Sequence, residues 1–352
     1  MIFRASLLLS SLIAALPVFF VAVPSSHAFD GCNTAPTSSL VVNVKDKGAK
    51  GDGVNNDTAE IQKAINEIAG TGGTVYVPDG VYMVRTTGKS RFKLGSKMTL
   101  KLSPGAVLKA IPNSSKSYSV LSIRKATDVN VIGGTLLGDR LNHEGTAGEW
   151  GMGIRIGPEV KRVTITGVTA KEMWGDGFYV EGATDVALCS VVATHNRRQG
   201  LSIVEANRLL VTNSVFQQTR GTRPSAGIDI EPDHPEQKVA NIRIEHSKFI
   251  NNAGGGVMIA GKRGTVADVE IVRNVFEEGR PILIENAPHV RSTAICDNRH
   301  IGKVAPPQEG LNAFAETIEV VSLQADCRGG RDMRFEMNRG NTKKNKKKKP
   351  AN

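Results

Sequence analysis

The stretch GIRIGPEVKRVTITGVTAKEMWGDGFYVEGATDVALCSVVA, residues 153–193, contains the pattern that decides the fold. A glycine followed by an apolar, a variable and another apolar residue occurs twice in it and recurs further along, at Gly153, Gly177, Gly200, Gly227 and Gly256. Successive glycines lie 24, 23, 27 and 29 residues apart. The alternation of apolar and variable positions predicts one short strand in every repeat.

A second alternating segment lies between these strands. Its copies, such as RVTITGVTA and DVALCSVVA, begin at Asp128, Arg162, Asp185, Arg208, Asn241 and Asp268. No helical pattern separates the segments, so two short strands are predicted for each repeat. A unit of this length cannot bury its apolar face alone, which is typical of a solenoid. Because every repeat contributes its strands in the same direction, the sequence predicts an all-β parallel β-helix whose coils stack about 4.8 Å apart.

The end of such a solenoid needs a cover, because a bare coil exposes unpaired backbone and core. Residues 55–70, NNDTAEIQKAINEIAG, predict an amphipathic helix capped by Asp57 or Thr58. Its apolar side chains fall on one face, namely Ile61, Ala64, Ile65 and Ile68. We expect this helix to shield the N-terminal end of the solenoid.

The segment VKDKGAKGDGVNNDTAEIQKAINEIAGTGGTVYVPDGVYMV, from Val44 to Val84, resembles the N-terminal signature of the secreted pectate-lyase and polygalacturonase superfamily. With the repeats behind it, the resemblance covers about residues 40–300. It implies a single-stranded right-handed parallel β-helix that acts on carbohydrate, but hydrolases, lyases and epimerases share this scaffold. The paired Asp-Asp, Gly-His-Gly and Arg-Ile-Lys elements of polygalacturonases are missing, so their residues do not carry over as a set.

The two ends of the sequence differ from the repeats. Residues 1–28 contain Arg4, an apolar run and a small-residue site ending at Ala28, which predicts a cleaved signal peptide and a secreted protein. An uncleaved membrane anchor is the alternative. We expect a β-helix domain with its helical cap over 29–298, a C-terminal cap or loop layer over 299–341, and a disordered Lys-rich tail over 342–352.

Composition is that of an ordinary globular protein, with 40% hydrophobic and 22% charged residues among 352. The net charge of +11 is concentrated in six lysines within residues 343–349, so a general nucleic-acid-binding surface is not expected. The four cysteines have no CxxC spacing, which disfavours a zinc or redox site. A Cys296 to Cys327 disulfide is one alternative, and the sequence leaves the pairing open.

In the glycine-led strands the apolar residues point inward, so the intervening positions should point outward in two rows. The first row is Arg155, Tyr179, Ser202, Asp229 and Met258. The second row is Gly157, Glu181, Val204, Glu231 and Ala260. An aromatic ring, an arginine and three acids on one face suit a polysaccharide lying in a groove.

The densest acidic point is GIDIEPD, around Asp229 and Glu231. Two residues apart on one strand, these carboxylates should lie about 7 Å apart on the same side. That spacing suits the acid and base of a glycosidase, and the repulsion would raise one pKa. Glu181 and Asp233 are supporting candidates. A cation-binding or merely solvated acidic cluster is the alternative.

Two further motifs contribute candidates. In WGDGFYV, Asp176 is a third catalytic candidate and Trp174 offers a stacking face, although a simple turn aspartate is the alternative. In HNRRQGLSI, an arginine could neutralise a uronate carboxylate or, with a lowered pKa, remove a proton. The substrate-binding candidates of this motif are His195, Arg197 and Arg198. Solvated turn charges are the alternative.

Three functions follow. The first is a secreted glycoside hydrolase that uses Asp229 and Glu231 as acid and base. The second is a polysaccharide lyase that removes a uronate proton with a bound calcium and Arg197 or Arg198. The third is a non-catalytic carbohydrate-binding or surface-structural β-helix. The hydrolase needs no cofactor. The expected partner is a polysaccharide, with no specific nucleic acid and no stable membrane anchor, and the oligomeric state is left open.

Overall fold

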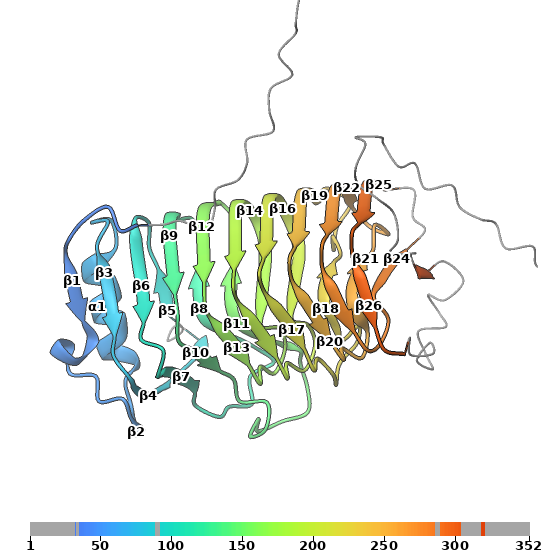
Figure 1. Ribbon diagram of the computed structural model, residues 1–352. Coiled ribbons are helices and arrows are strands. Elements are labelled where there is room, and N and C mark those ends of the chain that lie inside the picture. Colours follow the sequence, from blue (N-terminus) through green and yellow to red (C-terminus); the bar gives the residue numbers. More distant parts are fainter. Residues whose placement is uncertain (1–31, 33–34, 89–91, 286–288, 304–317, 321–352) are drawn as a thin grey trace, which may run out of the picture. The chain divides into compact units, whose positions relative to one another are not determined.

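The computed structural model describes residue 32 and residues 35–88, 92–285, 289–303 and 318–320, whose strands are shown in Figure 1. All of them belong to one compact unit, Gly31–Asn352. The predicted signal peptide and Lys-rich tail lie outside the described residues, as does most of the predicted C-terminal layer. In the described part of the chain, no helix is long and apolar enough to cross a membrane.

The predicted parallel β-helix is confirmed, because strands of successive coils pair in parallel and form two long sheets (Figure 1). Within the described residues the larger sheet has 17 strands: β1 (Val41–Asn43), β3 (Thr74–Val77), β5 (Phe92–Leu94), β6 (Met98–Leu102), β8 (Ser117–Ile123), β9 (Thr127–Ile132), β11 (Trp150–Ile156), β12 (Val160–Thr166), β14 (Phe178–Cys189), β16 (Leu201–Thr212), β18 (Ala226–Ile230), β19 (Lys238–Glu245), β21 (Gly255–Ile259), β22 (Thr265–Val272), β24 (Ile282–Glu285), β25 (Val290–Cys296) and β27 (Ile318–Val320). The described part of the other sheet has 10: β2 (Asp52–Asn56), β4 (Gly80–Val84), β7 (Ala106–Ala110), β10 (Thr135–Leu137), β13 (Thr169–Lys171), β15 (Val192–Thr194), β17 (Val215–Gln217), β20 (Lys248–Ile250), β23 (Val275–Glu277) and β26 (Arg299–Ile301).

The prediction of two strands per repeat was wrong, because the second alternating segment is divided by a turn. β12 ends at Thr166 and β13 begins at Thr169, and the later coils repeat this break. The residues that make the turn have a left-handed backbone, at Gly167, Ser190, Asn213, His246 and Arg273. The turn takes two residues, so the buried positions on its two sides lie three residues apart, as at Ile165 and Val168. The prediction of a single strand for this segment took no account of that break in the alternation.

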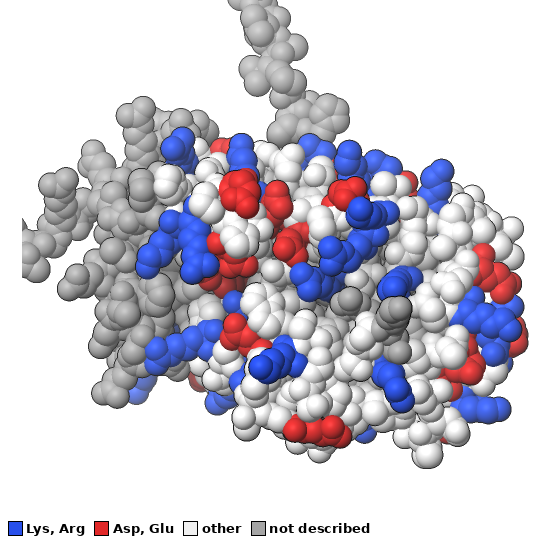
Figure 2. Space-filling model, turned by 180° about the vertical axis from the view of Figure 1, so that it is seen from behind, with Lys and Arg blue, Asp and Glu red and all other residues white. Residues whose placement is uncertain are grey.

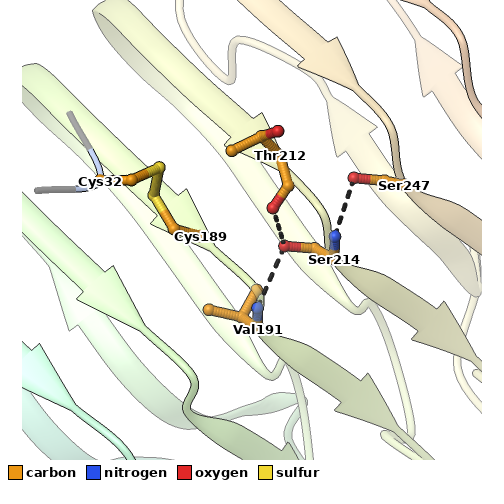
Figure 3. The surroundings of a disulfide bond; sticks show 6 residues. All are labelled: Cys32, Cys189, Val191, Thr212, Ser214 and Ser247. Atoms are coloured by element: carbon orange, nitrogen blue, oxygen red, sulfur yellow. Dashed lines mark hydrogen bonds between the residues drawn. A yellow bond between two sulfur atoms is a disulfide. The ribbon is translucent and has the colours of Figure 1, made fainter. Parts of the chain in front are cut away.

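The interior consists of ladders in which one residue type repeats from coil to coil. Phe216, Phe249 and Phe276 are buried and stack with ring centroids 5.4 and 4.8 Å apart. Buried hydroxyls satisfy the backbone at the turns: the Ser214 Oγ accepts from the Val191 N–H, and the Ser247 Oγ accepts from the Ser214 N–H (Figure 3). Each coil is therefore fixed to the next by both packing and side-chain hydrogen bonds.

The predicted N-terminal helix is present as α1 (Thr58–Ile68), preceded by the short 3-10 helix η1 (Val44–Lys47). The predicted apolar face is buried, with Ile61, Ile65 and Ile68 fully inaccessible. Figure 1 shows α1 beside β1 and β3, at the N-terminal end of the stack. Asp57 precedes the helix, but its carboxylate accepts from the backbone of the preceding loop at Lys50 and Gly51 rather than from the helix.

At the other end of the stack, β26 extends the smaller sheet past residue 298 by pairing in parallel with β23. The strand β27 pairs with β24 in the antiparallel direction, unlike the strands of the coils. An antiparallel strand occupies the hydrogen-bonding positions that the next coil would otherwise use, so it ends the parallel stacking on that edge.

A disulfide joins Cys32 to Cys189, at the end of β14, across 157 residues of sequence (Figure 3). The sequence did not predict this pairing. Cys296 is also disulfide-bonded, whereas Cys327, the partner considered for it, lies outside the described residues.

Positively and negatively charged side chains are mixed on the surface. Arg162 donates to Asp128, and Arg208 donates to Asp185, each with its Nε 2.6 Å from a carboxylate oxygen. Figure 2 shows that Lys and Arg side chains are also interspersed with Asp and Glu side chains on the face turned away in Figure 1.

Candidate active site

The first outward row is in register across five coils. Tyr179 pairs with Arg155 on one side and Ser202 on the other, and Asp229 pairs with Ser202 and Met258. The prediction that these side chains face solvent was wrong for most of them, since Tyr179, Ser202 and Asp229 are only 2%, 3% and 2% exposed. Neighbouring side chains, among them Trp150 and Arg198, enclose part of this row.

The second row is interrupted, contrary to the prediction. Glu181 of β14 lies opposite Glu205 of β16 and not opposite Val204, because the register shifts between Val180 and Glu181. A second shift between Glu181 and Ala183 restores the original register, so the irregularity is a local one. The sequence pattern could not show this shift, since both Val204 and Glu205 follow a normal glycine-led strand.

A hollow in the surface lies over the first row. It is lined by Trp150, Tyr179, Arg198, Ser202, Val204, Asp229, Glu231 and Asp233. Five of these eight residues belong to the two rows predicted from the alternation along the strands: Tyr179, Ser202, Val204, Asp229 and Glu231. The hollow combines apolar walls with converging polar groups, as ligand sites in proteins do.

Asp229, in β18, is the most deeply placed acid of the hollow. Its Oδ2 atom accepts a hydrogen bond from the Gln199 Nε2 atom at 2.8 Å, and its Oδ1 atom has no hydrogen-bond partner among the described residues. The pKa of Asp229 is raised well above its ordinary value, first by burial and then by the Glu231 carboxylate, and the Arg198 guanidinium offsets only part of this. A carboxyl held protonated in this way can act as a general acid.

Glu231 follows β18 directly and is partly exposed, so it shares the hollow with Asp229 but meets more solvent. Asp233 lies two residues further along and also lines the hollow. The two carboxylates predicted to act together thus reach the same space with different burial, which is the arrangement that separates an acid from a base.

Asp176 lies in the turn before β14 and is fully buried. Its Oδ2 atom accepts from the Ser202 Oγ at 2.9 Å and from the Arg198 Nη1 at 3.1 Å. Burial raises the pKa of Asp176 to about 6, although Arg198 and Ser202 oppose the rise. Because Asp176 does not line the hollow, we assign it to holding Arg198 and Ser202 in place rather than to contact with substrate.

Arg198 connects the acids of the site. Its guanidinium contacts Asp176 and lies 3.9 Å from Glu149, and its side chain is only 13% exposed. Burial alone would lower the pKa of Arg198, but the carboxylates of Asp176, Asp229, Glu149 and Glu231 raise it by more. The predicted alternative of Arg198 as a base with a lowered pKa is therefore contradicted, and the side chain stays a cation.

Two family descriptions match the chain. Residues 41–125 match "Rhamnogalacturonase A/epimerase, pectate lyase-like", and residues 134–297 match "Right handed beta helix region". The chain is a right-handed parallel β-helix whose N-terminal part is similar to the pectate-lyase-like family.

Individual relatives of this β-helix protein are distant. The protein YclG of Bacillus subtilis (strain 168) is 26% identical over 254 residues, which cover 62% of this chain and 43% of that protein. The mannuronan C5-epimerase AlgE4 of Azotobacter vinelandii is 36% identical over 149 residues, which cover 39% and 27%. The family 28 exopolygalacturonase of Yersinia enterocolitica shares the fold, with a TM-score of 0.58 and 15% identity over 77% of this chain and 62% of that one. The matches thus span less than half the length of YclG and of AlgE4.

Trp174 of this β-helix protein does not offer the stacking face that was predicted. Its ring is sandwiched between the His143 ring, 4.0 Å away, and the Arg197 guanidinium, 3.8 Å away. Arg197 also donates to the Gly148 and Trp174 carbonyls, so it is a structural clamp. The two faces of the indole are therefore occupied by protein.

Trp150 takes the place expected for Trp174. It lies at the start of β11, lines the hollow, and meets the Tyr179 ring edge-on at 6.1 Å. Trp150 lies four residues before the buried Ile154, so simple alternation along the strand predicts that both side chains point inward. The pairing of β11 with β8 is interrupted at Gly153, however. No signal in the sequence marks that interruption, so Trp150 was missed.

The remaining candidates, Arg155 and His195, are not among the residues that line the hollow. Arg155 donates to Glu181 at 2.9 Å and lies 5.3 Å from the centroid of the Tyr179 ring. His195 is exposed in a left-handed turn, with its Nδ1 atom 2.8 Å from the Thr194 Oγ1. It does not line the hollow. Within the described residues, no three His, Cys, Asp or Glu side chains are grouped to hold a metal ion.

Proposed function

We propose that this protein is a secreted enzyme that hydrolyses glycosidic bonds of a polysaccharide, with Asp229 as the acid and Glu231 as the base. The observation that carries the proposal is the unequal environment of these two carboxyls in one hollow. Asp229 is buried with a raised pKa, and Glu231 is partly exposed beside it. Such a pair supplies a proton and accepts one at the same pH.

The chemistry uses groups that the site contains. Asp229 donates its proton to the glycosidic oxygen as the bond from that oxygen to the anomeric carbon breaks. Glu231 accepts a proton from the water whose oxygen joins the anomeric carbon. Trp150 and Tyr179 supply apolar surface for a sugar ring, and the permanent charge of Arg198 favours a substrate that carries anionic groups.

Two observations outside the site support the wider proposal. The relatives named as an exopolygalacturonase and a mannuronan epimerase have polysaccharides in their names, which favours the same class of substrate here. The leader-like sequence of residues 1–28 and the Cys32 to Cys189 disulfide favour action outside the cytoplasm.

The test is incubation of the mature protein with a panel of neutral and uronic polysaccharides, with and without a chelator. Hydrolysis releases reducing ends without a new ultraviolet absorbance, and this is the expected result. An absorbing unsaturated product would overturn hydrolysis in favour of a lyase. Altered sugar composition without shorter chains would overturn it in favour of an epimerase, and binding alone would leave the non-catalytic alternative.

A further inference from the structure

Gln199 is a fully buried amide that the sequence did not single out. It lies just before β16, and both ends of its side chain are used. The Oε1 atom accepts from the Ala226 N–H at 2.8 Å, and the Nε2 atom donates to the Asp229 Oδ2 at 2.8 Å. A backbone N–H can only donate, so the amide oxygen must face Ala226 and the NH2 group must face Asp229.

This fixed orientation distinguishes the two oxygens of Asp229. The NH2 group only donates, so Oδ2 serves as its acceptor whether or not the carboxyl carries a proton. The other oxygen, Oδ1, is buried without a hydrogen-bond partner among the described residues. We propose that Gln199 is a positioning residue that directs the acidic proton of Asp229 to Oδ1, the oxygen that has no hydrogen-bond partner among the described residues.

The neighbouring Asp176 shows what a different partner does. Its Oδ2 atom is also occupied and its Oδ1 atom is also unpartnered among the described residues, but one donor to it is the Arg198 cation. A cation favours the ionised carboxylate strongly, whereas a neutral amide favours it only weakly. The charged groups that act on Asp229 are Glu231, Arg198, Asp176 and Asp233. A neutral donor therefore lets Asp229 remain an acid while still fixing its plane.

The experiment replaces the amide and follows Asp229 itself. Gln199→Met keeps the volume but removes the donor, so we expect the pKa of Asp229, followed by carbon-13 NMR of the full mature chain, to rise by about 1. Asn252→Leu is the matched control, because Asn252 is a buried amide that also accepts from one backbone N–H and donates to another group, but away from Asp229. An Asp229 pKa that moves no more in Gln199→Met than in the control would overturn the proposal.

Gln199→Glu covers the case in which Gln199→Met does not fold. It keeps an acceptor for Ala226 and places a second carboxyl against Oδ2, so the two groups should titrate as a coupled pair. Independent titration would overturn the proposal.

The consequence for catalysis rests on the proposed function: with an active substrate, kcat should fall at least tenfold in Gln199→Met with little change in KM. If no polysaccharide is cleaved by the wild type, the proposed function fails while the NMR result still decides the role of Gln199.

Discussion

Asp229 illustrates how far a single residue can be predicted from a strand pattern. Parity placed Asp229, Glu231, Tyr179 and Ser202 on one outward face, and the structure brings all four to one hollow. Parity could not predict that Asp229 is buried, because the residue that helps to cover this face, Trp150, reaches it through an irregular strand pairing. The burial that raises the pKa of Asp229 thus comes from tertiary packing, which the strand pattern does not contain.

Replacement of Asp229 by asparagine tests the acid directly. The amide keeps the shape of the buried side chain but has no acidic proton, so turnover should fall at least a hundredfold. The melting temperature should stay close to that of the wild type. Asp128→Asn is the control, because it makes the same chemical change at an ion pair with Arg162 outside the hollow. Turnover that survives in Asp229→Asn would remove this residue from the mechanism.

Asp176 predicts a pH dependence of stability. Its pKa rises from 3.8 to about 6 on folding, so the folded state binds this proton more tightly than the unfolded state. Its contribution to the free energy of unfolding is complete below pH 3.8 and is lost as pH rises through about 6. The loss corresponds to about 3 kcal/mol. Wild type should therefore lose stability relative to Asp176→Asn between pH 4 and 7 in urea denaturation.

For Asp128 we expect the opposite change of stability with pH. The hydrogen bond from Arg162 lowers the pKa of Asp128, so its contribution is present at neutral pH and is lost as the solution is acidified. Wild type should lose stability relative to Asp128→Asn as pH falls. A stability difference between wild type and Asp176→Asn that does not change with pH would contradict the assignment for Asp176.

Among the elements, the segment from residue 138 to residue 149 matters most for the site. His143 fixes it by stacking on Trp174 and by a contact of 2.9 Å between its Nδ1 atom and the Asp139 Oδ2. The segment leads directly into β11, where Trp150 lines the hollow. The contacts of His143 with Trp174 and Asp139 therefore help to set the position of Trp150 at the hollow.

His143→Ala should loosen this wall. Hydrogen exchange over residues 139–149 should become faster, and the fluorescence of the two tryptophans in the chain should change, because Trp174 loses its stacking partner. KM should rise about tenfold, equivalent to about 1.4 kcal/mol, with a smaller change in kcat. Leu141→Ala is the control, since Leu141 lies in the same segment and is 73% exposed. Exchange rates equal to those of the control would show that His143 does not hold the segment.

The elements also show where periodicity succeeds and fails. The amphipathic face of α1 was predicted residue by residue, because one helix packs against one surface. The third strand of each coil was not predicted, since a two-residue turn interrupts the alternation for only one step. The shift at Glu181 was not predicted either, since a local register shift leaves no periodic pattern.

For the whole molecule, the stacked coils act as a one-dimensional array in which each coil contacts its neighbours. The Cys32 to Cys189 disulfide departs from this plan, because it joins residues 157 positions apart. In a chain-entropy account, a loop of this size reduces the entropy of the unfolded chain by an amount worth about 5 kcal/mol. The disulfide is therefore expected to contribute strongly to overall stability.

The double variant Cys32→Ser and Cys189→Ser should be less stable than the wild type by up to about 5 kcal/mol in urea denaturation. Replacing both cysteines avoids a free thiol that could exchange with the remaining disulfide. Ser190→Ala, at the neighbouring turn residue, controls for local disturbance at the end of β14. Equal denaturation midpoints for the double variant and the wild type would show that the bond adds no stability.

The position of this disulfide also has a mechanical consequence. Tension applied to the chain N-terminal to Cys32 would pass through the sulfur bridge into β14, whose other end lies beside Asp176 and Tyr179. The coils between the two cysteines would carry no load until the bridge was reduced. A pull from that side would thus act first on the coil that carries Tyr179, one of the residues that line the hollow, and the earlier coils would unwind only after reduction.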